Sequence, residues 1–261
     1  MAADVPARDP WQALRQSTPA RIGLGRVGDA PPLGAMLDFQ LAHARARDAV
    51  HKPLDVEALG ASLGRLPYVT AQSLAPDRGT YLRRPDLGRK LDPACLGRLP
   101  AGNWDVVFVI ADGLSAAAVQ RHAAMLLKAA LPRLGGWQIA PVVIVTGGRV
   151  AVGDEIGGAV GARLCAMLIG ERPGLSVADS LGVYLTYGPR AGRRNSERNC
   201  ISNIHLAGGL TYEAAAGKLV WLMTEARQRQ MTGVGLKDEA PALAPAPPQL
   251  GGQGTIPAAR K

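Results

Sequence analysis

The sequence is poor in aromatic residues and has no long hydrophobic run. Phe, Trp and Tyr make up 4% of its 261 residues, although 47% of the residues are hydrophobic. The core must therefore consist mainly of aliphatic side chains and alanine. No apolar run approaches the ~20 residues that a membrane-spanning helix needs. The start of the chain lacks the basic and apolar regions of a secretion signal, so we expect a cytoplasmic protein.

Cysteine is also scarce, and its positions exclude two classes of protein. The only three cysteines, Cys95, Cys165 and Cys200, are widely spaced. Disulfide-stapled domains and zinc sites need cysteines in even numbers or in close pairs. This spacing predicts free thiols in a reducing compartment.

The common catalytic and nucleotide-binding motifs are missing as well. The four histidines lie apart, and no pair has the spacing of metal ligands on a helix. Gly113 stands alone where a dinucleotide site needs three glycines. Asp112 has no second acidic residue nearby that would help to hold a metal. We therefore predict neither a catalytic residue nor a metal ligand in this chain.

Negative charge is in deficit, with a formal net charge of +9. Nucleic-acid binding is the obvious interpretation, but the basic residues come singly or in pairs and few aromatic residues stand beside them for base stacking. The pattern favours a solvated basic surface or an interface with an acidic protein, and no nucleic acid.

The hydrophobic pattern predicts an α/β fold with several parts. Residues 1–20 are predicted to be flexible and residues 21–100 to form a mainly helical subdomain. Residues 101–236 alternate apolar strands with helices, which predicts a Rossmann-like parallel sheet covered on both faces. Residues 237–261 are rich in Pro, Ala and Gly and are predicted to be disordered. The expected helices are residues 32–53, 56–63, 87–91, 115–131, 154–160 and 212–230, and the expected strands are residues 105–111, 141–146, 164–169 and 183–187.

Two neighbouring segments carry the candidate site. The third predicted strand ends at Gly170 and leads into a rigid Glu-Arg-Pro-Gly loop, where open α/β sheets bind ligands. Glu171 is well placed there for a ligand, or it pairs with a surface arginine. Farther along, Cys200 lies among amide and hydroxyl side chains, so it is either a buried apolar-like thiol or part of a polar ligand wall. These polar side chains are Asn199, Ser202 and Asn203.

His205 needs separate treatment because Asn203-Ile-His-Leu-Ala-Gly208 differs by one residue from the Asp-x-His-x-x-Gly motif of some cobalamin proteins. Asn203 replaces the aspartate that orients the histidine ring in that motif. The segment also comes late in the sheet. We therefore predict that His205 is not a cobalt ligand.

Several blocks of this chain resemble the small, or light, subunit of ethanolamine ammonia-lyase. The similarity spans about residues 18–236 and leaves out only the two ends. The blocks are residues 21–26 (RIGLGR), 39–51 (FQLAHARARDAVH), 112–115 (DGLS), 152–157 (VGDEIG), 170–175 (GERPGL), 179–187 (DSLGVYLTY) and 198–204 (RNCISNI).

The resemblance implies an adenosylcobalamin-dependent radical lyase that converts ethanolamine to acetaldehyde and ammonia. It implies a TIM-barrel large subunit that holds the substrate, a higher-order hetero-oligomer, and a setting in the cytoplasm or in a bacterial microcompartment. This chain would cover the cofactor with its Rossmann-like domain. By motif, the family's cofactor contacts fall on Val150, Glu171 and Cys200, and cobalt keeps the cofactor's own base.

Two other functions are compatible with the residues alone. One is a stand-alone Rossmann-like protein that binds a nucleotide or anion at Asp112 and Ser115, where the first sheet helix begins. The other is a basic scaffold protein without a ligand. Retention of a corrin together with a barrel partner, or of a nucleotide by the isolated chain, would distinguish them.

Overall fold

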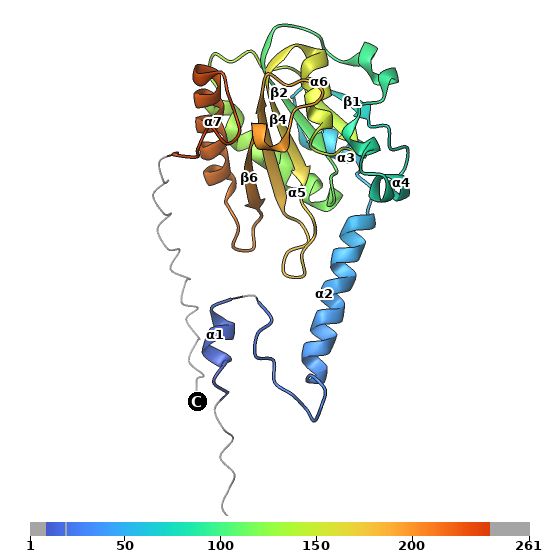
Figure 1. Ribbon diagram of the computed structural model, residues 1–261, viewed down its shortest axis with the longest axis vertical. Coiled ribbons are helices and arrows are strands. Elements are labelled where there is room, and N and C mark those ends of the chain that lie inside the picture. The colour runs from blue at the N-terminus through green and yellow to red at the C-terminus, as the bar shows by residue number, and fades with distance from the viewer. Residues whose placement is uncertain (1–8, 19, 241–261) are drawn as a thin grey trace, which may run out of the picture.

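The computed structural model describes residues 9–18 and 20–240, and most of them surround one six-stranded sheet (Figure 1). Residues 1–8 and 241–261, which are parts of the segments 1–20 and 237–261 predicted to be flexible and disordered, lie outside the described residues. The strands are β1 (Tyr68–Gln72), β2 (Trp104–Ala111), β3 (Val142–Thr146), β4 (Ala162–Gly170), β5 (Leu181–Tyr187) and β6 (Arg198–Ile204). The α-helices are α1 (Gln12–Gln16), α2 (Leu33–His51), α3 (Val56–Ser62), α4 (Arg78–Arg83), α5 (Ala116–Ala130), α6 (Val152–Val160) and α7 (Tyr212–Arg229). The 3-10 helices are η1 (Leu87–Arg89), η2 (Pro93–Arg98), η3 (Leu131–Arg133) and η4 (Asn195–Glu197).

The strand order is β1-β3-β2-β4-β5-β6, which confirms the α/β class. Strands β1, β3, β2 and β4 run parallel to one another, as predicted. Strand β5 is antiparallel to β4, and β6 is antiparallel to β5. The expectation of a wholly parallel sheet is therefore wrong for the last two strands. The reason is the connection between β4 and β5, residues 171–180. It contains no helix and is shorter than the crossover of roughly a dozen residues that parallel neighbours need.

Strands β1 and β6 were not predicted. Strand β1 lies in the segment expected to be mainly helical, and it pairs with β3 at the edge of the same sheet. Strand β6 is the polar segment around Cys200. Both are edge strands with partly exposed residues, so neither shows the continuous apolar run by which buried strands are recognised. The division of the chain into domains stays a prediction.

The sheet has a hydrophobic core on each face. Helices α5 and α7 cover the first face, and α6 covers part of the second. On the first face, Ile110 packs with Leu126 and Leu222, and on the second Val109 packs with Ile156. Each of these side chains is almost fully buried, and such burial stabilises the fold by about 1.5–3 kcal/mol per side chain. The small aromatic content is thus compensated by aliphatic packing on both faces.

Local signals predicted α3 and α5 correctly, whereas α1 and α4 were not predicted and α6 begins two residues before the expected residue 154. Asp55 accepts a hydrogen bond from Ala58 N and begins α3, and Ser115 accepts one from Ala118 N and begins α5. Helix α6 ends at Gly161, whose φ of +74° suits glycine.

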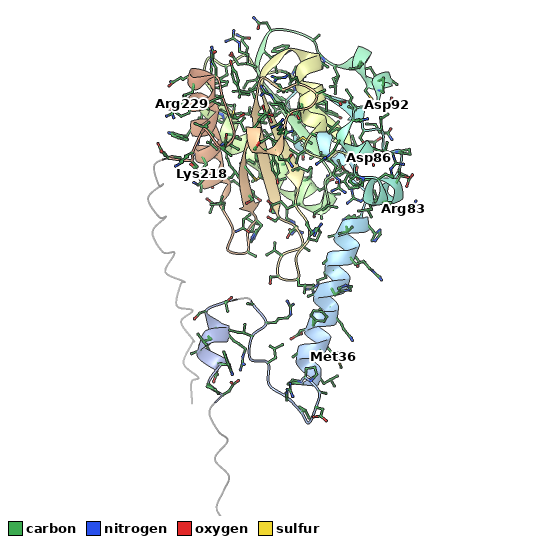
Figure 2. All side chains as sticks on the ribbon, viewed as in Figure 1. Met36, Arg83, Asp86, Asp92, Lys218 and Arg229 are labelled. Carbon is green, nitrogen blue, oxygen red and sulfur yellow. The ribbon has the colours of Figure 1, made fainter. Side chains whose placement is uncertain are left out.

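Helix α2 differs from the other long helices because it projects away from the sheet (Figure 1). The helix forms where the sequence predicts it, but Ala49 is its only buried residue. Leu33 and Leu37 are 64% and 53% exposed, and Met36 lies on the projecting part of the helix (Figure 2). At its other end, Arg78 holds α2 through a hydrogen bond to Val50 O. No helix among the described residues is long and apolar enough to cross a membrane.

Candidate functional site

The second face of the sheet is covered at one end of the β5–β6 hairpin and open at the other. On this face Thr186 and Arg198 are 2% and 7% exposed, because α6 reaches over them. One step along the ladder, Tyr184 is only half-buried and its cross-strand neighbour Cys200 is exposed. The face therefore opens toward the end of β4. We call this region the open face and define it by Glu171, Gly182, Tyr184 and Cys200.

Glu171 is the first residue after β4 and stands at the rim of the open face. Its Oε2 atom accepts hydrogen bonds from Ser180 Oγ at 2.5 Å and from Asn203 N at 3.2 Å. Both bonds that the described residues make to this carboxylate reach Oε2, and Oε1 faces Gly182. Two donors thus hold the side chain in place while one oxygen keeps its capacity to accept a hydrogen bond from a ligand.

A β-bulge in β6 supplies one of these donors. Leu181 pairs with Ile204 but Val183 pairs with Ile201, so Ser202 and Asn203 together oppose Gly182 and β6 contains one extra residue. Asn203 adopts a φ of +65°, and its N–H donates to Glu171. Bulges often re-aim backbone groups in this way beside functional sites.

The predicted polar wall is only partly present. Asn199 turns away from the open face: its Nδ2 donates to Leu236 O at 2.6 Å, and its Oδ1 accepts from Gly233 N. It therefore holds the chain that follows α7. The prediction that Asn199 lines the ligand is wrong, because alternate residues of a strand point to opposite faces.

Gly182 is buried, and the Glu171 side chain lies over it. A Cβ atom at this position would lie 2.9 Å from Oε1 and 3.2 Å from Cγ of Glu171. The glycine therefore makes room for the Glu171 carboxylate on the open face.

The phenol of Tyr184 and the thiol of Cys200 keep their protons on the open face. Burial, together with the nearby Cys200 and Glu171, raises the pKa of Tyr184 to about 12. Burial also raises the pKa of the Cys200 thiol, and the carboxylate of Glu171 adds to the effect. At neutral pH the face presents a neutral phenol, a neutral thiol and one carboxylate. This set can bind polar, uncharged groups, but it has no activated nucleophile.

The structure brings Glu171 and Cys200 together, with Tyr184 between them, but places Val150 farther along the sheet. Val150 lies between β3 and α6, and β2 separates its strand from the strand that precedes Glu171. It is half-buried and packs against the core of the same face. All three predicted residues thus belong to one side of the sheet.

A buried ion pair, which sequence reasoning missed, joins α6 to the hairpin. Arg198 donates to both carboxylate oxygens of Asp154, and its Nη1 atom also donates to Thr186 Oγ1 at 3.0 Å. The side chains of Arg198 and Asp154 are each 2% exposed. Burial raises the pKa of Asp154, and the guanidinium opposes that rise. The pair closes the covered end of the face, two residues before Cys200.

The crevice where a Rossmann-like sheet usually binds a nucleotide is filled by the protein itself. Helices α5 and α6 leave neighbouring strands β2 and β3 toward opposite faces, which marks that crevice. There Asp112 Oδ1 accepts from Gly148 N, and Oδ2 pairs with Arg78 at 3.2 Å. The Ser115 hydroxyl donates to Ala178 O and caps α5. The side chains of Asp112 and Ser115, the predicted anion-binding residues, are therefore both engaged with partners within the protein.

His205 uses both ring nitrogens in its own turn. Its Nδ1 atom accepts from Ala207 N at 3.2 Å, so Nε2 carries the proton and donates to Asn203 Oδ1 at 2.8 Å. Within residues 9–18 and 20–240, no cluster of three or more His, Cys, Asp or Glu side chains could hold a metal ion.

Comparisons with known proteins identify the family. The model of the ethanolamine ammonia-lyase light chain (EutC) family matches residues 8–237. The chain belongs to this family. It is 54% identical over 242 residues to the ethanolamine ammonia-lyase small subunit of Azotobacter vinelandii, which covers 89% of each chain. It is also 53% identical over 250 residues to the small subunit of Ralstonia nicotianae, covering 91% of this chain and 92% of the relative.

Membership of the light-chain family agrees with the resemblance in the sequence. The matched region includes the whole sheet, the open face and the projecting helix α2. A light chain is named as one part of a larger enzyme, so the site must be considered together with a partner.

Proposed function

We propose that this chain is the small subunit of an adenosylcobalamin-dependent ethanolamine ammonia-lyase and that its open face covers part of the cobalamin. The enzyme would convert ethanolamine to acetaldehyde and ammonia by a radical mechanism. The chain would work with a TIM-barrel large subunit that binds the substrate.

The observation that carries this proposal is the geometry of Glu171. Its carboxylate is held through Oε2, and Oε1 lies over the buried Gly182 without a hydrogen bond from the described residues. A corrin ring is rimmed by amide side chains, which donate hydrogen bonds. A carboxylate that is held by one oxygen and can accept through the other suits such a rim. This acceptor therefore fits the group.

Three residues would hold the cofactor. Glu171 would accept a hydrogen bond from an amide, Cys200 would pack against the ring as a soft neutral thiol, and Val150 would contribute an apolar surface from the loop after β3. Cobalt would keep the cofactor's own base, because both nitrogens of His205 already have protein partners. Electron paramagnetic resonance of the reduced enzyme with 15N-labelled histidine would contradict this if it showed a histidine hyperfine splitting.

The absence of acid–base machinery fits this division of labour. When bound, adenosylcobalamin supplies the radical by homolysis of its cobalt–carbon bond, and the protein supplies binding and exclusion of water. We assign no catalytic residue to this chain.

The projecting helix α2 supports the presence of a large partner. Its exposed apolar side chains form a surface that a monomer rarely leaves in water. These side chains are Leu33, Met36, Leu37, Phe39 and Leu41. We propose a higher-order hetero-oligomer with the large subunit, in the cytoplasm or enclosed in a bacterial microcompartment.

The test is reconstitution. The purified chain with adenosylcobalamin should not deaminate ethanolamine, whereas the chain with its large subunit should do so and retain the corrin absorbance. Deamination by the isolated chain would contradict the proposed division of labour. Retention of a nucleotide by the isolated chain would instead support a stand-alone binding protein.

A further inference from the structure

We propose that Tyr184 is a further cofactor-contacting residue, whose phenol works with the Glu171 carboxylate as a donor–acceptor pair for a primary amide of the corrin rim. This inference rests on the proposed function and adds a residue to its site.

The register of the sheet places Tyr184 at the centre of the open face. It pairs with Met167 on one side and with Cys200 on the other. Its ring packs against the core of the second face, and the side chain is only half-buried. The anchored ring loses little freedom on binding a ligand, so the phenol is preorganised.

The chemistry of the pair matches an amide. A primary amide has a carbonyl that accepts a hydrogen bond and an NH2 group that donates two. The phenol of Tyr184 stays protonated at neutral pH and donates, whereas Glu171 accepts through Oε1. Neither group alone satisfies both halves of an amide, but the two together do.

Two other tyrosines of the described chain are already committed to internal partners. Tyr81 O–H donates to Gly148 O, and Tyr212 O–H bonds His122 Nδ1 at 2.8 Å. The phenol of Tyr184 instead lies within hydrogen-bonding reach of the Cys200 thiol, which is a weak acceptor. The carbonyl of an amide is a stronger acceptor and can replace the thiol as the partner of the phenol.

Tyr184→Phe tests the proposal, and Tyr187→Phe is a matched control. Tyr187 lies on the same strand but packs against the core of the opposite face. Cobalamin is titrated into the complex of each variant with the large subunit, and binding is followed by corrin absorbance. We expect Tyr184→Phe to weaken binding roughly three- to tenfold and Tyr187→Phe to leave it unchanged. Unfolding midpoints of both variants should match the wild type.

Gly182→Ala gives a second readout that removes neither polar group but shifts one relative to the other. The added Cβ would push the Glu171 carboxylate out of position, so binding should weaken roughly tenfold. If Tyr184→Phe binds cobalamin as the wild type does while Glu171→Ala binds more weakly, Tyr184 is not a contact and the proposed function still stands. If the wild-type complex does not bind cobalamin, the proposed function and this inference both fail.

Discussion

The two halves of the second sheet face are built for different purposes. Over β2 and β4 the face is sealed by α6, and residues such as Val109 and Met167 are at most 1% exposed. Over part of the β5–β6 hairpin the same face is not covered, so Tyr184 is only half-buried and Cys200 is exposed. The sealed half contributes stability through apolar burial, whereas the open half contributes a surface that only a ligand or partner can cover. The border crosses the hairpin between the buried pair of Thr186 and Arg198 and the more exposed pair of Tyr184 and Cys200.

The largest effect is expected at the joint between the two halves. Arg198→Ala should lower the free energy of unfolding by about 3–5 kcal/mol, because it leaves the Asp154 carboxylate buried without its partner. Urea unfolding measures the change. The control is the double variant Arg198→Met with Asp154→Leu, which should recover most of the loss. A loss below about 1 kcal/mol for Arg198→Ala would mean that the halves are not joined by this pair.

A smaller effect, confined to binding, is expected on the open half. Glu171→Ala should weaken cobalamin binding by roughly ten- to a hundredfold, since an amide donor of the cofactor would lose its acceptor. The Michaelis constant for ethanolamine should hardly change, because the substrate lies in the partner. Titration and steady-state kinetics of the reconstituted complex measure both quantities. An unchanged cobalamin affinity with a raised Michaelis constant would remove Glu171 from the cofactor site.

Acid should loosen the loop that connects the halves. His122 accepts from Tyr212 O–H and donates through Nε2 to Asp179 O at 2.9 Å. Burial lowers the pKa of His122 below its usual 6.5. As the pH falls below about 6.5, the unfolded chain takes up a proton that the folded chain does not, so stability falls.

The control for this prediction is His122→Asn, which removes the titrating group. The free energy of unfolding, measured from about pH 7 to pH 5, should drop more steeply for the wild type than for the variant. Parallel curves for the two proteins would show that His122 does not couple the loop to pH.

The smallest effect is expected at Cys200. Cys200→Ser changes the size of the side chain little and replaces a soft thiol by a hydroxyl, so cobalamin affinity should fall by at most about threefold. A loss larger than that of Glu171→Ala would reverse the ranking of the two residues. The same titration decides this.

Sequence reasoning succeeded for the sealed half and was incomplete for the open half for one physical reason. Strands β2, β3 and β4 are buried on both faces, so they appear as continuous apolar runs. Strand β6 is polar on one face and interrupted by a bulge, and its residues gave the pattern of a ligand wall rather than of a strand.

Only the part of the candidate site that depends on a single residue and its place in the chain could be predicted from the sequence. Glu171 follows directly from its place after a buried strand. The roles of Gly182 and Tyr184 depend on cross-strand pairing between β5 and β6, which a single sequence does not reveal. The ion pair of Asp154 and Arg198 joins residues far apart in the chain and left no local signal.

The most direct measurement is the alkylation of Cys200 by iodoacetamide in the complex with the large subunit, followed by mass spectrometry with and without cobalamin. A pH of about 9 compensates for the raised pKa of the thiol. Cys95 and Cys165 are buried and serve as internal controls. If cobalamin covers the open face, Cys200 is labelled without the cofactor and protected by it. An equal rate in both states, or no labelling in either, would contradict the assignment of this face to the cofactor.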